Sequence, residues 1–217
     1  MRRVRQAFVA SASLRPMAQQ LLQDRTPSAY AGVEAFARRH PKEDAGALAW
    51  LVLGYAHTLD HDYAKAVDPL NRAKAGASEL GDYVAYYLGD AYLKTVHNAE
   101  ALSTLADFSK NFPDSLLIRD AHLVYASALL AEGRAQEAAA LLENDRAPVR
   151  ADLELAIGRA YEAAGLFVLW VVQFVVPSLR LPMMYVYGAW IAIELALVFA
   201  GRKKLEAFGA FARVWRK

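Results

Sequence analysis

The chain has 217 residues, enough for one domain with an appendage or two small units, and its 56% hydrophobic and 22% charged residues exclude a disordered polypeptide. The net charge of +2 is divided unevenly: residues 1–165 carry 18 basic and 21 acidic side chains, whereas residues 166–217 carry 7 and 2. A slightly acidic body argues against nucleic acid as a partner, and the absence of cysteine excludes disulfides, thiolate nucleophiles and thiolate zinc sites.

The first 27 residues predict an N-terminal helix. Their start, Met1 to Arg5, is basic like the beginning of a signal peptide. The stretch that follows, Gln6 to Leu14, is too short and too polar for the apolar core that a signal peptide requires. A cleaved signal peptide is therefore not the favoured interpretation.

Residues 28–165 contain an internal repeat of paired helices. Small residues recur at matching places, namely Gly54, Gly89, Ala126 and Gly158 on first helices and Ala66, Ala101 and Ala138 on second helices. The first-helix positions are 35, 37 and 32 residues apart, close to the ~34 of helical-hairpin repeats. Upstream, the second helix of an earlier copy is matched by Ala29, Val33, Phe36 and Pro41. Since one hairpin cannot bury its own apolar face, we expect the hairpins to stack.

With Trp50, Leu53 and Gly54 opening its first full copy, this region resembles the tetratricopeptide-repeat (TPR) superfamily. The resemblance implies an all-α solenoid of about three and a half helical hairpins over residues 28–165. The phrase from Phe108 to Ser115 resembles repeats of bacterial envelope proteins, among them the helical superhelix of soluble lytic transglycosylases. The Glu-Ser motif of a transglycosylase catalytic domain is missing, so the resemblance implies no enzyme activity.

In TPR proteins the first helix of each pair lines a concave groove. Carried over to this chain, the resemblance implies that a protein or peptide partner binds at Tyr55, Tyr83, Tyr86, Asp90, Lys94, Asp120, Ser127, Asp152 and Arg159. Tyrosines mixed with charges of both signs suit an extended peptide or a helix, because aromatic anchors provide affinity and charges provide specificity. The alternative is that these residues are solvated positions on a spacer.

The repeat pattern stops after Gly165, and residues 166–201 form a hydrophobic segment. Its second run, Leu181–Gly201, has one charge, Glu194, and at about 1.5 Å per residue it is long enough for the ~30 Å bilayer core. Three interpretations stay open: a transmembrane helical hairpin, which the length favours, a single span, or two helices in a soluble core. The stretch Pro177–Pro182 and the helix after it resemble the small membrane subunit of tripartite transporters.

The tail, residues 202–217, is basic and amphipathic. Its cations are Arg202, Lys203, Lys204, Arg213, Arg216 and Lys217. They predict a cytoplasmic C-terminus by the positive-inside rule and favour contact with anionic lipid. We therefore expect membrane lipid to contact residues 166–217 at the bacterial inner membrane. A hairpin would leave the repeats in the cytoplasm, and a single span would place them on the other side.

Few residues suggest a catalytic or metal-binding site. One stretch has the composition of a metal site, with His57, Asp60, His61 and Asp62. The repeat pattern places His61 in a turn, where exposed polar residues are common, and His122 has no evident acid or nucleophile beside it. Phosphate-binding glycine loops and zinc-protease motifs are absent from the sequence. We therefore expect no enzyme activity, no metal and no cofactor.

Together these observations predict a non-enzymatic, membrane-anchored TPR scaffold that holds a protein partner in its groove. Two alternatives stay open. One is an accessory superhelical fragment of a peptidoglycan-cleaving enzyme that lacks its catalytic domain, and the other is an accessory subunit of a membrane transport system. The abrupt change near Gly165 also permits a fusion of two unrelated coding pieces.

Overall fold

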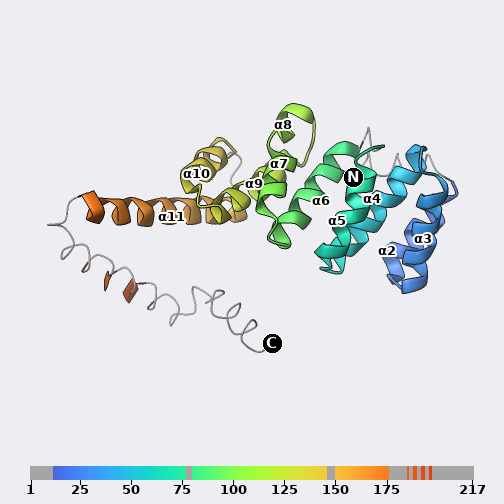
Figure 1. Cartoon of the computed structure of the whole chain (residues 1–217), viewed down its shortest axis with the longest axis horizontal. Coiled ribbons are helices and arrows are strands. Elements are labelled where there is room, and N and C mark those ends of the chain that lie inside the picture. The colour runs from blue at the N-terminus through green and yellow to red at the C-terminus, as the bar shows by residue number, and fades with distance from the viewer. Residues whose placement is uncertain are drawn as a thin grey trace. The chain divides into compact units, whose positions relative to one another are not determined.

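A computed structural model describes residues 12–76, 80–145 and 150–175, with six single residues between 185 and 196. Its regular elements in these ranges are helical (Figure 1). In chain order they are α2 (Leu14–Asp24), α3 (Pro27–Arg39), α4 (Asp44–Leu59), α5 (Tyr63–Ala73), α6 (Gly81–Lys94), α7 (Asn98–Leu105), α8 (Phe108–Asn111), α9 (Ile118–Ala131), α10 (Ala135–Asn144) and α11 (Ala151–Val175). Backbone contacts divide the chain into two compact units, residues 1–163 and 164–217.

The first unit is a row of helical hairpins. Helices that follow one another along the chain pack together, so that α4 contacts α5, α5 contacts α6, α6 contacts α7, and α9 contacts α10. Helix α2 packs against α3 and α4 and buries Leu14, Ala18 and Leu21. The helix expected within residues 1–27 is thus the first partner of α3, and together they form a hairpin ahead of the first full repeat.

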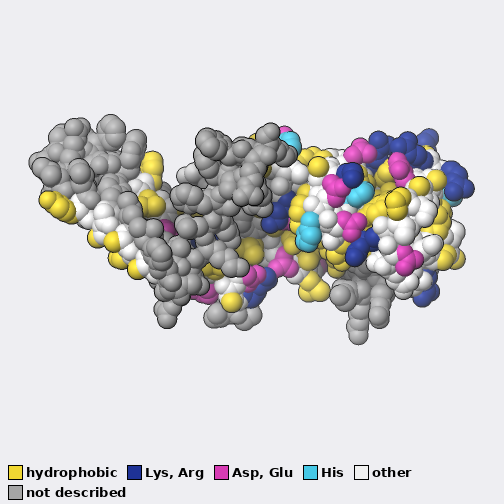
Figure 2. Space-filling model, turned by 90° about the horizontal axis from the view of Figure 1, so that it is seen from below, with side chains coloured by type: hydrophobic (Ala, Val, Ile, Leu, Met, Phe, Trp, Pro, Cys, Tyr) yellow, Lys and Arg dark blue, Asp and Glu magenta, His cyan; other side chains and the backbone are white. Residues whose placement is uncertain are grey.

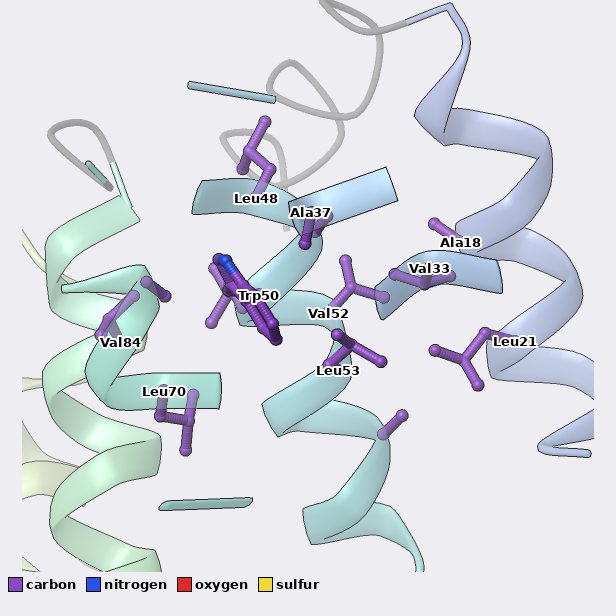
Figure 3. Close-up of a cluster of buried hydrophobic side chains, with 14 of the residues drawn as sticks. Ala18, Leu21, Val33, Ala37, Leu48, Trp50, Val52, Leu53, Leu70 and Val84 are labelled. Atoms are coloured by element: carbon purple, nitrogen blue, oxygen red, sulfur yellow. The ribbon is translucent and has the colours of Figure 1, made fainter. Parts of the chain in front are cut away.

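The small residues of the first helices allow close helix contact. A Cβ atom added to Gly54 would lie 2.4 Å from the Cγ atom of Leu70, and one added to Gly89 would lie 2.6 Å from atoms of Leu105. In both hairpins the leucine follows its glycine by sixteen residues and is buried, as Figure 3 shows for Leu70 and its neighbours. The close approach that the repeat pattern predicts is therefore present in both hairpins.

The turns of three hairpins, α4–α5, α6–α7 and α9–α10, share one backbone conformation. His61, Val96 and Gly133 have positive φ angles of 58°, 64° and 75°. The N–H of the residue after each donates a hydrogen bond to the carbonyl five residues before it, at 2.9, 2.9 and 2.8 Å. This pattern is a helix C-cap closed by a left-handed residue, a conformation that only glycine adopts without steric strain. The turns repeat at the 35- and 37-residue spacings of the small first-helix residues.

Helix α11 ends the row differently. Its first turns bury Leu153, Ile157 and Ala160 against α9 and α10. The helix then continues through Gly165 to Val175, and the side chains of Leu166, Phe167 and Val168 are exposed. Residues 176–184 and 197–217, with half of those between, lie outside the described residues, so the predicted membrane hairpin and basic tail fall largely beyond them. None of the described helices is long and apolar enough to span a membrane.

Candidate partner-binding groove

One stripe of α6 carries four of the nine predicted groove residues. Tyr83, Tyr86, Asp90 and Lys94 recur at three-, four- and four-residue steps, which place them along one face of a helix. The structure adds Tyr87 to this stripe. The tyrosines and Asp90 are half-buried, and Lys94 is exposed.

Two tyrosine rings of this stripe and one ring from α4 form a contact cluster. The ring centroid of Tyr87 lies 5.0 Å from that of Tyr55 on α4 and 5.1 Å from that of Tyr86. Burial raises the pKa of Tyr86 to about 12, and burial also raises the pKa of Tyr87. Both phenols are therefore protonated at neutral pH and can donate hydrogen bonds. We call Tyr55, Tyr86 and Tyr87 the tyrosine cluster.

An arginine that the repeat pattern does not predict joins two other predicted groove residues. The guanidinium of Arg150 contacts the Asp120 carboxylate of α9 at 2.7 Å and the Asp152 carboxylate of α11 at 2.6 Å. The hydrogen bond from Arg150 lowers the pKa of Asp152. Arg150 precedes α11 and has no basic counterpart in the earlier copies, so the repeat pattern held no signal for it.

Asp90 differs from these two paired aspartates. It is half-buried, and within the described part of the chain no hydrogen bond or ion pair reaches its carboxylate. Burial raises its pKa, and the positive charge of Lys94, one turn further along α6, opposes this shift. Asp90 is therefore a predicted groove residue whose carboxylate has no close counter-ion among the described residues.

The other predicted groove residues have separate surroundings. The hydroxyl of Ser127 donates to the carbonyl of Leu123, 2.8 Å away within α9. Arg159 is exposed on α11. The structure thus brings Tyr55, Tyr86 and Asp90 close together through Tyr87. Ser127 and Arg159 occupy the repeat position of Tyr55 and Asp90 on the next two first helices, α9 and α11.

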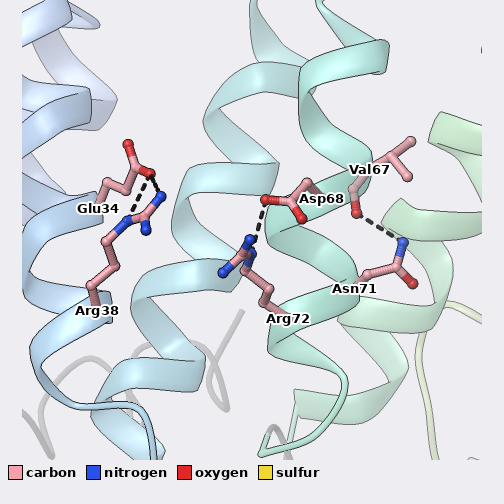
Figure 4. Close-up of polar contacts among 6 residues, drawn as sticks. All are labelled: Glu34, Arg38, Val67, Asp68, Asn71 and Arg72. Atoms are coloured by element: carbon pink, nitrogen blue, oxygen red, sulfur yellow. Dashed lines mark hydrogen bonds and ion pairs between the residues drawn. The ribbon is translucent and has the colours of Figure 1, made fainter.

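A cleft of about 510 Å³ lies elsewhere, where α3 ends, α4 begins and α5 ends. Arg38, Lys42 and Arg72 line it together with Glu43 and Asp44. The two arginines are held by carboxylates of their own helices, Glu34 at 2.7 Å and Asp68 at 2.9 Å (Figure 4). Arg72 also lies 5.0 Å over the ring of Trp50. One face of the molecule likewise shows acidic and basic side chains interspersed (Figure 2).

The residues with a metal-like composition have other contacts. His57 stacks on Tyr30 with ring centroids 4.4 Å apart, and the Tyr30 hydroxyl donates to Asp60 at 2.7 Å. His61 lies in the turn, as expected, with its ring nitrogen 3.2 Å from the Tyr63 hydroxyl. Within residues 12–76, 80–145 and 150–175, no group of three or more histidine or acidic side chains is placed to hold a metal ion.

The prediction that His122 has no acid or nucleophile beside it was wrong. The Nε2 atom of His122 lies 2.5 Å from the Ser109 hydroxyl, and its Nδ1 atom is hydrogen-bonded to the Asp145 carboxylate. These partners lie 13 and 23 residues away, on α8 and just after α10, so spacing along the chain did not reveal them. The three residues therefore connect α8, which follows the α6–α7 hairpin, with the hairpin of α9 and α10.

The comparisons with known proteins concern the fold. No family model and no curated protein sequence matches the chain. Two crystal structures of nearly identical TPR-like repeats from a Podosopora anserina protein described as a kinesin light chain are similar to it, one of them of a single-substitution variant. The variant has a TM-score of 0.57 at 18% identity and covers 93% of this chain and 97% of its own. The other has a TM-score of 0.55 at 18% identity, with 88% and 95% covered.

Likeness at this identity shows the fold, and it confirms the all-α, TPR-like solenoid expected from the repeats. The narrower resemblances to envelope proteins and to a transporter subunit stay predictions.

Proposed function

Starting from a TPR-like solenoid, we propose that the protein is a non-enzymatic scaffold whose first-helix groove binds a segment of a protein partner. The observation that carries this proposal is the tyrosine cluster, three half-buried rings on two first helices. Aromatic side chains of this kind provide much of the affinity at protein interfaces, because they bury a large area with little loss of side-chain freedom. The similarity to TPR-like repeats supports the same class of function.

Partner capture tests this proposal. The double variant Tyr55→Ala and Tyr87→Ala removes two contacting rings of the cluster and is expected to reduce recovery of cross-linked partners from cells at least about ten-fold. Leu116→Ala is the matched control, because Leu116 is a large hydrophobic residue, 85% exposed, in the loop before α9. Equal recovery with the double variant and the control, at equal helical content, would contradict groove binding.

We also propose that residues 166–217 attach the scaffold to the bacterial inner membrane, with a cytoplasmic tail. The supporting observations are the apolar run Leu181–Gly201, the basic tail, and the exposed apolar side chains of Leu166, Phe167 and Val168 on α11. Isolated membranes washed with alkaline carbonate test this attachment. Retention of the protein is the expected result, and release into the wash contradicts it. Protease accessibility of the repeats from each side then separates a hairpin from a single span.

A further inference from the structure

The carboxylate of Asp90, which no described residue pairs, lies on the same stripe of α6 as two rings of the tyrosine cluster. Asp90 follows Tyr86 by four residues and Tyr87 by three, so the three side chains share one face of α6. The Tyr55 ring on α4 extends this face by its contact with Tyr87. A carboxylate and three ring surfaces therefore adjoin on the first helices of two successive hairpins.

The chain supplies close counter-ions to the other groove aspartates. Asp120 and Asp152 share the guanidinium of Arg150. That guanidinium is already hydrogen-bonded to both of them, and Asp90 forms no ion pair with any residue in the described ranges. Lys94 lies one turn away with its side chain exposed to water, which screens its charge.

A half-buried carboxylate in this position favours binding of a positively charged group. Removing an ionised carboxylate from water is unfavourable unless a counter-charge replaces the lost hydration. The negative faces of tyrosine rings also attract cations, with arginine and lysine as the usual partners. Both properties select the same chemistry, an ammonium or guanidinium group with an apolar stem.

We propose that the groove holds a lysine or arginine side chain of the bound partner, with its charge on the Asp90 carboxylate and its stem on Tyr86 and Tyr87. This inference rests on the proposed function, because it names the chemistry by which the same groove selects its partner. The bound segment is basic at this point.

The test uses n-butylammonium chloride, an analogue of the lysine side chain, with the full-length protein in a non-ionic detergent. Carboxyl and tyrosine-ring ¹³C signals are followed by NMR, against sodium chloride at the same concentration. Wild-type protein is expected to show saturable shifts at Asp90, Tyr86 and Tyr87 with millimolar affinity. Asp90→Asn is expected to weaken that affinity at least about ten-fold, since it removes the charge of the acceptor.

Two further variants make the result specific. Asp68→Asn removes a carboxylate on α5, outside the predicted groove, that already has Arg72 at 2.9 Å, and it is expected to leave n-butylammonium binding within about two-fold of wild type. Lys94→Ala removes the nearby positive charge and is expected to tighten binding. The proposal is overturned if no saturable shift occurs, or if Asp90→Asn and Asp68→Asn behave alike.

These outcomes are separate from those of the partner-capture experiment, which uses no amine. Loss of capture with the tyrosine double variant, together with absent n-butylammonium binding, would retain the groove and reject the cation site. Binding of n-butylammonium that depends on Asp90 supports the cation site. If the tyrosine substitutions leave partner capture unchanged, binding of the partner in the groove is rejected. The cation site is then judged by n-butylammonium binding.

Discussion

The hairpin of α4 and α5 and the long helix α11 begin from the same sequence pattern and differ in structure. In the hairpin, Gly54 lies against Leu70, so closely that a Cβ atom would clash. In α11, no described residue outside the local helix backbone has an atom within 4 Å of a Cβ added to the equivalent Gly158, and the helix runs on where the earlier copies turn back. A small residue in this pattern therefore permits a hairpin but does not produce one.

The residues that follow explain the difference. A second helix needs a small residue at the place of Ala66, Ala101 and Ala138, which are all fully buried. The equivalent residue after Gly158 is Trp170. An indole at this place is far larger than the methyl group that the packed hairpins accommodate. The fourth copy thus keeps its first helix and lacks the means to pack a second one in the same way.

The largest expected effect separates the packed hairpin from the open helix. Leu70→Ala removes a fully buried side chain and is expected to lower the free energy of unfolding by about 2–5 kcal/mol. Leu166→Ala on α11 is the control, because Leu166 is exposed, and its effect is expected to stay below about 0.5 kcal/mol. Urea unfolding followed by circular dichroism measures both. Equal effects would show that the hairpin and α11 are packed alike.

Alanine at the two equivalent glycines should change stability in opposite directions. Gly54→Ala places a methyl group 2.4 Å from Leu70 and is expected to cost about 1–3 kcal/mol. Gly158→Ala meets open space in a helix and is expected to increase stability by about 0.5–1 kcal/mol. Thermal unfolding of the two variants provides the comparison. A loss of stability with Gly158→Ala would mean that this side of α11 is covered.

The hairpin turns provide a smaller effect. Val96 holds a left-handed conformation although it is β-branched, and its side chain is 78% exposed. Val96→Gly should therefore relieve strain and raise the free energy of unfolding by about 1 kcal/mol. Gly133→Val, at the same place in the next hairpin, should lower it by about the same amount. If both substitutions destabilise the protein, side-chain packing rather than backbone strain governs the turns.

The smallest expected change in stability concerns Asp90, one of the predicted groove residues. Burial raises the pKa of Asp90 in the folded state, so the charged carboxylate opposes folding above that pKa. Asp90→Asn is expected to raise stability at pH 7 by about 0.5 kcal/mol. The difference from wild type should shrink as the pH falls through the folded-state pKa and vanish below the lower unfolded-state pKa, where the carboxyl group is neutral in both states.

Asp152→Asn is the matched control for this experiment. The hydrogen bond from Arg150 lowers the pKa of Asp152, so its contribution to stability is present above the unfolded-state pKa and is lost as the pH falls through the folded-state pKa. The two substitutions should therefore have opposite signs at pH 7. Unfolding curves recorded between pH 3 and about pH 8 measure both, over the range in which carboxyl groups titrate.

The sequence was sufficient to locate the hairpins and their close contacts. Small residues must recur wherever two helices approach, so Gly54 and Gly89 stand at the repeat interval and predict the fold without any long-range information. The same interval placed Tyr55 and Asp90 at equivalent points of successive first helices. Such signals are local, because each hairpin is made of residues that are close along the chain.

Only the tertiary structure decided which side chains meet between hairpins. Tyr87 joins the cluster because α4 and α6 pack at a distance that lets its ring contact Tyr55. Arg150 neutralises Asp120, and His122 joins Ser109 to Asp145, across separations that follow no repeat interval. The physical reason is that stacking fixes these contacts through the position of whole helices, whereas the repeat pattern records only what each helix needs to pack on its neighbour.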